Sequence, residues 1–159
     1  MRLLLGVALA LAVGPALGQE RAQPQPACAY CAAGLGPIRV PVWDGKGKAE
    51  HACCGLECAL RLAAARYPIS IITIPAAAPQ PGEVVKVVRT GKRWTALPRS
   101  AVFLWVEAKD KAAGRQAFVT QARYIQYLTQ HPELAARQPR PLKLSVLMPR
   151  LAPPVSKRS

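Results

Sequence analysis

The sequence predicts an α+β fold, in which a ββα lobe is followed by a second small, β-rich α/β lobe. Three observations lead to this prediction. Runs rich in β-branched residues recur at strand length, and one Ala/Leu/Arg stretch without a breaker is long enough for a helix. A segment rich in proline and glycine separates the two groups of elements. The length of 159 residues suits one small domain or two tightly joined lobes.

The first lobe is predicted to contain a hairpin, a helix and a buried strand. Val and Ile around the turn Asp44-Gly45 indicate the hairpin, and Pro68 ends the helix. Proline and glycine in residues 75–82 then mark the boundary between the lobes. The expected elements are a strand at 38–43, a returning strand at 48–52, a helix at 56–66 and a strand at 70–74.

The second lobe repeats strands and a helix without cysteines. Thr120 is a suitable N-cap, and Tyr124, Tyr127 and Leu128 follow at helical spacing, which is typical of a helix face in a core. The expected elements are a strand at 83–90, a turn at 90–92, strands at 101–106 and 116–120, and a helix from 121 to 130. After residue 138 we expect a flexible tail with one strand-like piece at 142–147.

The N-terminal residues have the features of a secretory signal peptide. A basic Arg2 precedes the apolar run 3–13, and the small residues Ala16-Leu17-Gly18 precede Gln19. The run is shorter than the about 20 apolar residues that a membrane-spanning helix needs. We therefore expect cleavage after Gly18 and a periplasmic or secreted protein.

The charge composition indicates which classes of partner the chain can bind. Lys and Arg number 22 against 8 Asp and Glu, a formal net charge of +14. An exported protein without a stacked aromatic pattern or a DNA-reading helix is not expected to bind nucleic acid. The charge indicates either a solvated basic surface or attraction to an acidic partner or an anionic membrane surface.

All five cysteines lie in one short stretch, which is the most informative pattern in the chain. Cys28 and Cys31 form a C-x-x-C knuckle, in which both sulfurs can approach one ion. Cys54 and Cys58 stand at i and i+4 at the start of the predicted helix and so face the same side. Knuckle, hairpin and helix together predict a treble-clef-like metal site in the lobe 28–74. Cys53 and His51 are further candidate ligands.

Alternatives to a metal site remain open at this point. Cysteines of exported proteins often form disulfides, although five is an odd number. Thiolates suit both Cu(I) and Zn(II), so the spacing does not choose between these metals. A thiol-disulfide oxidoreductase is a minor alternative, because Cys28-x-x-Cys31 opens no thioredoxin-like βαβ unit. We expect no enzyme.

The cysteine motif resembles the heavy-metal-associated treble clefs called TRASH and YHS domains, and the later segments resemble NosL-type accessory proteins of nitrous-oxide reductase. The later segments that carry the resemblance are Val87 to Trp94, Ala101 to Trp105, Arg115 to Phe118 and the helix that leads into Gln130-His131-Pro132. The resemblance implies a two-lobed α/β fold and an exported Cu(I) chaperone. Its implied partner is an acceptor copper enzyme, such as nitrous-oxide reductase, or a transporter.

The predicted organisation is therefore a signal peptide, a leader, two lobes and a tail. The leader is rich in proline and polar residues and is expected to be disordered. The ranges are 1–18 for the signal peptide, 19–27 for the leader, 28–74 for the metal-binding lobe, 83–137 for the second α/β lobe and 138–159 for the basic, Pro-rich tail.

Overall fold

The computed structural model describes residues 26–45, 50–77 and 82–151, and their elements confirm the α+β class. Two antiparallel sheets are combined with four helices in this part of the chain. The elements are β1 (Val40–Asp44), β2 (Glu50–Cys53), α1 (Leu56–Arg66), β3 (Ile69–Pro75), β4 (Val84–Thr90), β5 (Arg93–Leu97), β6 (Val102–Trp105), β7 (Arg115–Phe118), α2 (Gln121–Gln130), α3 (Pro132–Ala135) and α4 (Leu144–Leu151). The described residues contain no helix with the length and apolar character needed to span a bilayer.

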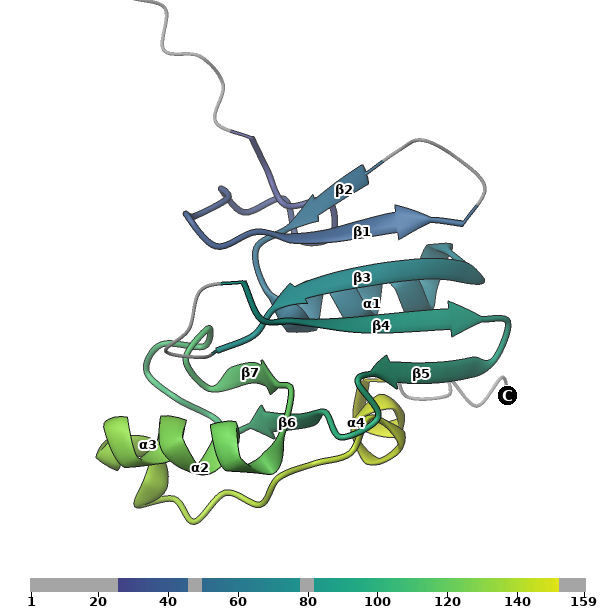
Figure 1. The fold of residues 1–159 in the computed structure, drawn as a ribbon. Coiled ribbons are helices and arrows are strands. Elements are labelled where there is room, and N and C mark those ends of the chain that lie inside the picture. Colours follow the sequence, from purple (N-terminus) through teal and green to yellow (C-terminus); the bar gives the residue numbers. More distant parts are fainter. Residues whose placement is uncertain (1–25, 46–49, 78–81, 152–159) are drawn as a thin grey trace, which may run out of the picture.

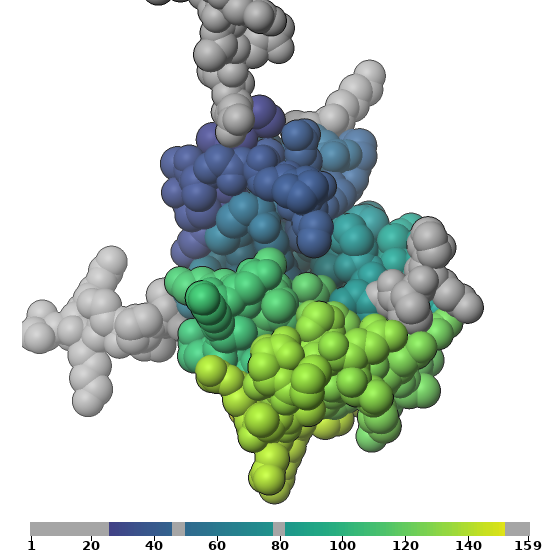
Figure 2. Space-filling view, turned by 90° about the vertical axis from the view of Figure 1, so that its left-hand side faces the viewer, coloured from purple at the N-terminus to yellow at the C-terminus, as the bar shows by residue number. Residues whose placement is uncertain are grey.

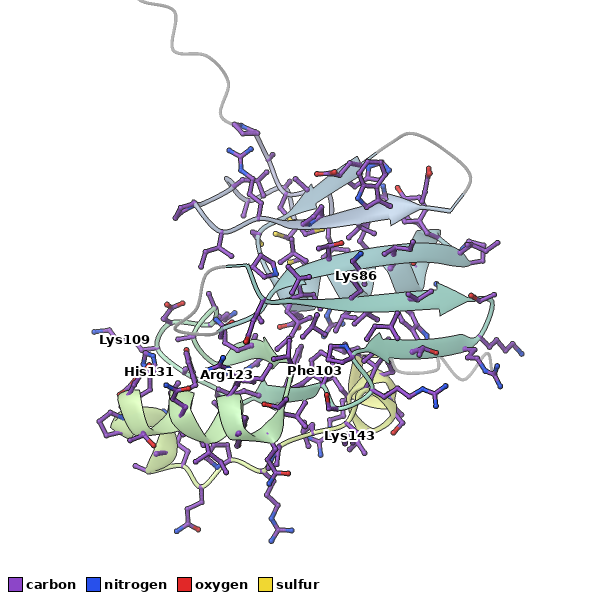
Figure 3. The ribbon with its side chains drawn as sticks, viewed as in Figure 1. Lys86, Phe103, Lys109, Arg123, His131 and Lys143 are labelled. Carbon is purple, nitrogen blue, oxygen red and sulfur yellow. The ribbon has the colours of Figure 1, made fainter. Side chains whose placement is uncertain are left out.

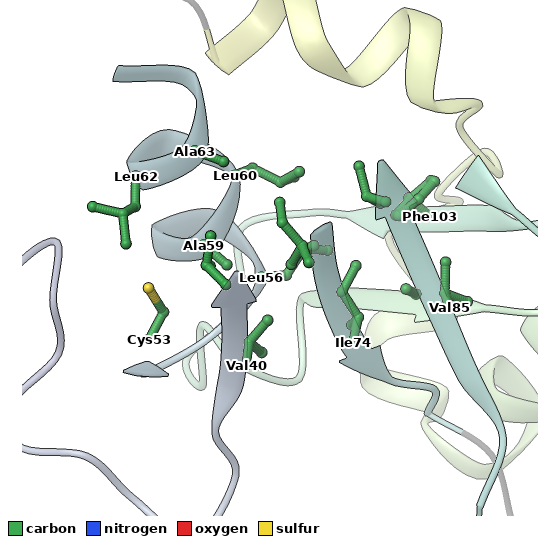
Figure 4. Packing of buried hydrophobic residues seen from close by; sticks show 14 of the residues in the cluster. Val40, Cys53, Leu56, Ala59, Leu60, Leu62, Ala63, Ile74, Val85 and Phe103 are labelled. Carbon is green, nitrogen blue, oxygen red and sulfur yellow. The ribbon is translucent and has the colours of Figure 1, made fainter. Parts of the chain in front are cut away.

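The larger sheet has five strands in the order β2-β1-β3-β4-β5, and α1 lies against one of its faces (Figure 1). Alternate residues point to this face, as the period of a strand requires. Val42, Ile72 and Val87 are fully buried beneath the helix, whereas Trp43 and Ile71 on the opposite face are partly exposed. The buried face therefore supplies the main core, with Leu56, Leu60 and Ala63 of α1 packed into it (Figure 4).

Arg89 of β4 fixes the C-terminal end of α1 on the sheet. Its Nη1 donates hydrogen bonds to the carbonyl oxygens of Ala63, Ala64 and Tyr67, which are among the last carbonyls of the helix. The Ala63 carbonyl also accepts the Tyr67 N–H at 3.1 Å, and a cation at this end complements the helix dipole. The guanidinium lies 5.1 Å from the centroid of the Trp94 ring in β5. The orientation of α1 is thus set from two strands.

The two predicted lobes share one sheet and one core. The predicted boundary at 75–82 lies between β3 and β4, which pair along their length from Ile69 opposite Thr90 to Pro75 opposite Val84. The main core contains Cys28 and Val40 from the first predicted lobe together with Val85 and Phe103 from the second. The proline- and glycine-rich segment therefore connects two neighbouring strands of one sheet. It does not separate two independently packed lobes.

The smaller sheet, β6 and β7, is buried on both faces. Phe103 and Ala117 face the main core, whereas Leu104 and Phe118 face a second cluster that α2 covers. This explains why the three successive residues Val102, Phe103 and Leu104 of β6 are all buried. Thr120 caps α2 as predicted, accepting a hydrogen bond from the Arg123 N–H at 3.3 Å, and the Tyr124, Tyr127 and Leu128 side chains pack in the second cluster.

The predicted flexible tail is wrong for the residues up to Leu151. Only Leu142 is strand-like, forming an isolated bridge with Phe103. The following residues form α4, whose Leu144, Leu147 and Leu151 are buried in the main core. Those three leucines repeat at i, i+3 and i+7, the helical signal, but Leu142, Leu144 and Val146 also alternate as in a strand. The longer period fits the structure.

Other predicted elements agree with the structure to within a few residues, and two elements were not predicted. The turn at Gly91-Lys92 joins β4 to β5, with Gly91 at φ 62°, a conformation that glycine adopts without steric cost. No strand was predicted at β5, nor a helix at α3. Pro26 and Ala27, the end of the predicted disordered leader, pair with Leu35 and Gly34. The signal peptide, residues 19–25, and positions 48 and 49 of the predicted second strand lie outside the described residues.

Candidate metal centre

Backbone hydrogen bonds fold Cys28 and Cys31 into a tight knuckle. The Cys28 N–H donates to the Ala33 carbonyl at 2.7 Å, and the Ala32 N–H donates back to the Cys28 carbonyl at 2.9 Å. Ala32 has a positive φ of 60°, which turns the chain sharply after Cys31. The Ala29 N–H also donates to the Ala52 carbonyl at 3.0 Å, so the knuckle is attached to β2.

Cys54 and Cys58 enter the site from the junction between β2 and α1. Cys54 follows the last residue of β2 and precedes α1, which begins at Leu56, whereas Cys58 lies in the first turn of this helix. The predicted placement of Cys54 on the helix is thus two residues too early. The sulfurs of Cys54 and Cys58 lie 3.5 Å apart. The Cys54 N–H points at the Cys28 sulfur at 3.4 Å, which links the helix side of the site to the knuckle.

The four sulfurs form one cluster, seen as the yellow atoms gathered near the β1–β2 hairpin (Figure 3). The ligand atoms of Cys28, Cys31, Cys54 and Cys58 all lie within 4.8 Å of one another, and Cys31 Sγ is 3.7 Å from Cys54 Sγ. A tetrahedral ion with bonds of about 2.3 Å to sulfur separates its ligands by roughly 3.8 Å. The four thiols therefore fit a single metal ion that prefers sulfur.

The cluster lies at the surface on one side and against the core on the other. Cys28 is only 3% exposed, Cys54 and Cys58 are half-buried, and Cys31 is exposed. All five cysteines of the chain are free thiols. Solvent or another molecule can therefore approach an ion held here from the side of Cys31.

Protonation differs among the ligands because burial and backbone donors oppose each other. Burial raises the pKa of the Cys28 thiol, but the N–H groups of Cys31, Cys54 and Tyr30 together outweigh it and bring the value to about 6. Burial and the sulfurs of Cys28 and Cys31 raise the pKa of Cys54 to about 11 against the opposing effect of Cys58, and burial raises the pKa of Cys58 strongly. The Cys28 thiolate is thus favoured at neutral pH, whereas Cys54 and Cys58 need the charge of a bound metal to ionise.

The other two candidate ligands are not among the four clustered cysteines, although the Cys53 thiol interacts with that of Cys28. Cys53 is fully buried and points to the helix, beside Ala59 and Leu62 (Figure 4), and burial raises its pKa to about 12. The His51 ring stacks on Tyr67, with Nε2 2.9 Å from the tyrosine hydroxyl. Tyr67 follows the last residue of α1, a helix roughly 16 Å long at 1.5 Å per residue. His51 is therefore at the opposite end of α1 from Cys58.

An apolar pocket of about 150 Å³ adjoins the cluster. Cys54 and Cys58 form part of its wall, together with the start of α1, Ile38, residues from β1 and β3, and the segment 111–116. The space-filling view shows this side of the molecule, where the blue N-terminal segments meet the green segments of the second half (Figure 2). The charged residues that line the pocket are Glu57, Lys111 and Arg115. Lys111 and Arg115 were not predicted, because no spacing along the chain indicates that they share a pocket with the cysteines.

Comparison of the chain with protein-family models, with curated proteins and with solved structures found no match. The functional assignment therefore depends on the residues and geometry of the site.

Proposed function

We propose that the protein is an exported, thiolate metal-binding protein that carries Cu(I) and delivers it to an acceptor copper enzyme or transporter, such as nitrous-oxide reductase. The observation that carries the proposal is the partial exposure of the four-cysteine cluster, with Cys31 exposed and Cys28 buried. A carrier has to release its ion, and ligand exchange requires an accessible side. Soft thiolates suit Cu(I).

Export is part of this proposal and is supported by the signal-like residues 1–18, with cleavage after Gly18. The resemblance of the later segments to NosL-type proteins supports the choice of client. The formal charge of +14 favours an acidic partner and is compatible with contact to an anionic membrane surface.

Cu(I) competition tests the proposal directly. Reduced protein is titrated anaerobically against a chromogenic Cu(I) chelator, and Cys31→Ser and Cys58→Ser are compared with the wild type. We expect the wild type to withdraw Cu(I) from the chelator and both variants to lose at least about tenfold in affinity, the equivalent of 1.4 kcal/mol. Cys53→Ala is the control for loss of a neighbouring thiol, since Cys53 contacts Cys28 but is not one of the four clustered cysteines. A wild type that cannot compete would refute the copper role.

A structural zinc site is the second candidate, and the sulfur separations favour it. Distances of 3.5 and 3.7 Å are close to those of a closed ZnS₄ tetrahedron. In that case removal of zinc should unfold the protein, as followed by circular dichroism, and bound zinc should resist displacement by Cu(I). Retention of the folded signal after zinc removal would exclude a purely structural role.

A further inference from the structure

The pocket beside the cysteine cluster has the properties of a recognition site. Its floor consists of apolar side chains contributed by Ile38, Val40, Leu56, Ile74 and Pro75. A cavity of about 150 Å³ can admit a group as large as benzene, so one amino-acid side chain fits. Ligand pockets typically combine such apolar walls with a few polar groups that fix orientation.

The positive charge at this pocket comes from the segment between β6 and β7 and from the start of β7. Arg115 is 9% exposed, and its guanidinium is engaged by Glu107, by the Val106 carbonyl and by Glu57 at 3.6 Å. Glu57 is in turn bound by Arg61 at 3.0 Å, so its negative charge is compensated. Lys111 is exposed and has no ion-pair partner among the described residues. An acidic group on an incoming molecule would therefore meet Lys111.

The cysteines in the pocket wall favour an occupant that contains a soft ligand atom. Cys54 and Cys58 line the pocket and belong to the four-cysteine cluster. A side chain seated here lies beside two of the metal's ligands. Methionine combines an adaptable apolar body with a thioether sulfur, and such sulfur is a preferred ligand of Cu(I).

We propose that this pocket seats a methionine side chain of the metal acceptor, flanked in the acceptor by acidic residues. The methionine fills the apolar space beside Cys54 and Cys58, and a neighbouring carboxylate pairs with Lys111. The acceptor's sulfur is thereby placed next to the ion before transfer. This inference rests on the proposed copper-carrier function, which supplies the acceptor.

A labelled peptide tests the pocket separately from the metal. An Asp-Met-Asp peptide is titrated onto reduced, metal-free protein and followed by fluorescence anisotropy, with Lys-Met-Lys as the charge-reversed probe. Lys111→Glu should weaken Asp-Met-Asp binding by about tenfold, since reversing one charge at contact distance in water changes the free energy by that order. Lys109→Glu, two residues away and outside the pocket lining, makes the same charge change and should leave binding unchanged (Figure 3).

Two further arms make the result decisive. Ala112→Trp places a large side chain in the pocket wall and should abolish peptide binding, while the chelator competition confirms that the thiols still bind Cu(I). On Cu(I)-loaded protein, Asp-Met-Asp should bind at least about tenfold more tightly than Asp-Leu-Asp, because only the thioether can bind the ion.

Equal binding of Asp-Met-Asp by Lys111→Glu and Lys109→Glu would overturn the pocket assignment. Unchanged binding in Ala112→Trp would overturn it as well. Equal binding of the Met and Leu peptides to the copper form would overturn the methionine. Failure of the proposed function is seen separately, as a wild type that cannot compete with the chelator.

Discussion

Gly114 is the residue with the least room for change near the pocket. A Cβ here would overlap the Val106 carbonyl oxygen and lie 3.0 Å from the Ala108 Cβ. The Val106 N–H also donates to the Gly114 carbonyl at 3.0 Å, so the two backbones cannot separate freely. Glycine is needed here for close approach, and this approach positions the segment that carries Lys111.

We expect Gly114→Ala to lower the free energy of unfolding by about 1–3 kcal/mol, the usual cost of forcing extra volume into a packed site. Urea denaturation followed by circular dichroism measures the change. Gly36→Ala is the matched control, since no atom lies within 4 Å of its added Cβ. Equal stability of the two variants would contradict the steric argument.

Tyr124 links protonation to stability. Its side chain is buried, its hydroxyl donates to the Pro139 carbonyl at 2.6 Å, and its ring meets the Phe118 ring edge-on. Burial raises the pKa of Tyr124 above the ordinary value of 10. The folded state therefore favours the neutral phenol, and the resulting stabilisation is complete below about pH 10 and is lost as the pH rises towards the folded-state pKa.

Tyr124→Phe should accordingly flatten the decline in stability above about pH 10, because phenylalanine has no proton to lose. At neutral pH the free energy of unfolding of the variant should be lower by about 1 kcal/mol, the usual contribution of one hydrogen bond. Urea midpoints measured between pH 8 and 11 compare the two slopes. Tyr127, whose pKa burial also raises, keeps part of the slope in the variant. Parallel curves would contradict the assignment to Tyr124.

At the scale of elements, α4 decides how much the C-terminal residues contribute to stability. Leu147 is fully buried in the main core, whereas Val146 beside it is 47% exposed. Leu147→Ala should cost about 2–5 kcal/mol, as large-to-small core substitutions do. Val146→Ala should stay within about 0.5 kcal/mol of the wild type. Thermal or urea unfolding of the pair measures the difference, and similar losses would show that α4 does not pack as described.

Sequence patterns predicted those elements whose structure is determined by residues close together in the chain. The hairpin around Asp44, α1 and the Thr120-capped α2 follow from strand alternation, an unbroken helical stretch and a capping residue. The four clustered cysteines could be predicted for the same reason, since the spacings from Cys28 to Cys31 and from Cys54 to Cys58 are local. In residues 142–147 two periods fitted the same short segment, and only packing against the core selects the helix.

Long-range contacts could not be predicted in this way. The stacking of His51 on Tyr67 and the burial of Cys53 under α1 depend on how the sheet meets the helix. The meeting of Lys111 and Arg115 with the cysteines likewise depends on where β7 lies against α1. Such contacts join residues far apart in sequence, and no periodicity records them.

At the scale of the whole molecule, a single sheet crosses the predicted boundary between lobes. Neither half, residues 19–77 or 82–159, should fold alone, because each would expose the strand edge formed by β3 or β4. We expect the full chain to unfold cooperatively and each fragment to show no cooperative transition in circular dichroism. A sharp transition and dispersed amide signals in either fragment would instead support two autonomous lobes.

The position of α4 also bears on when the protein can fold. This helix is the last described element, yet it contacts α1, β5 and β6 and contributes three leucines to the main core. A chain that emerges N-terminus first carries its cysteines long before the hydrophobic surface around them can close. The chain should therefore remain sensitive to protease until α4 is available to pack against the core.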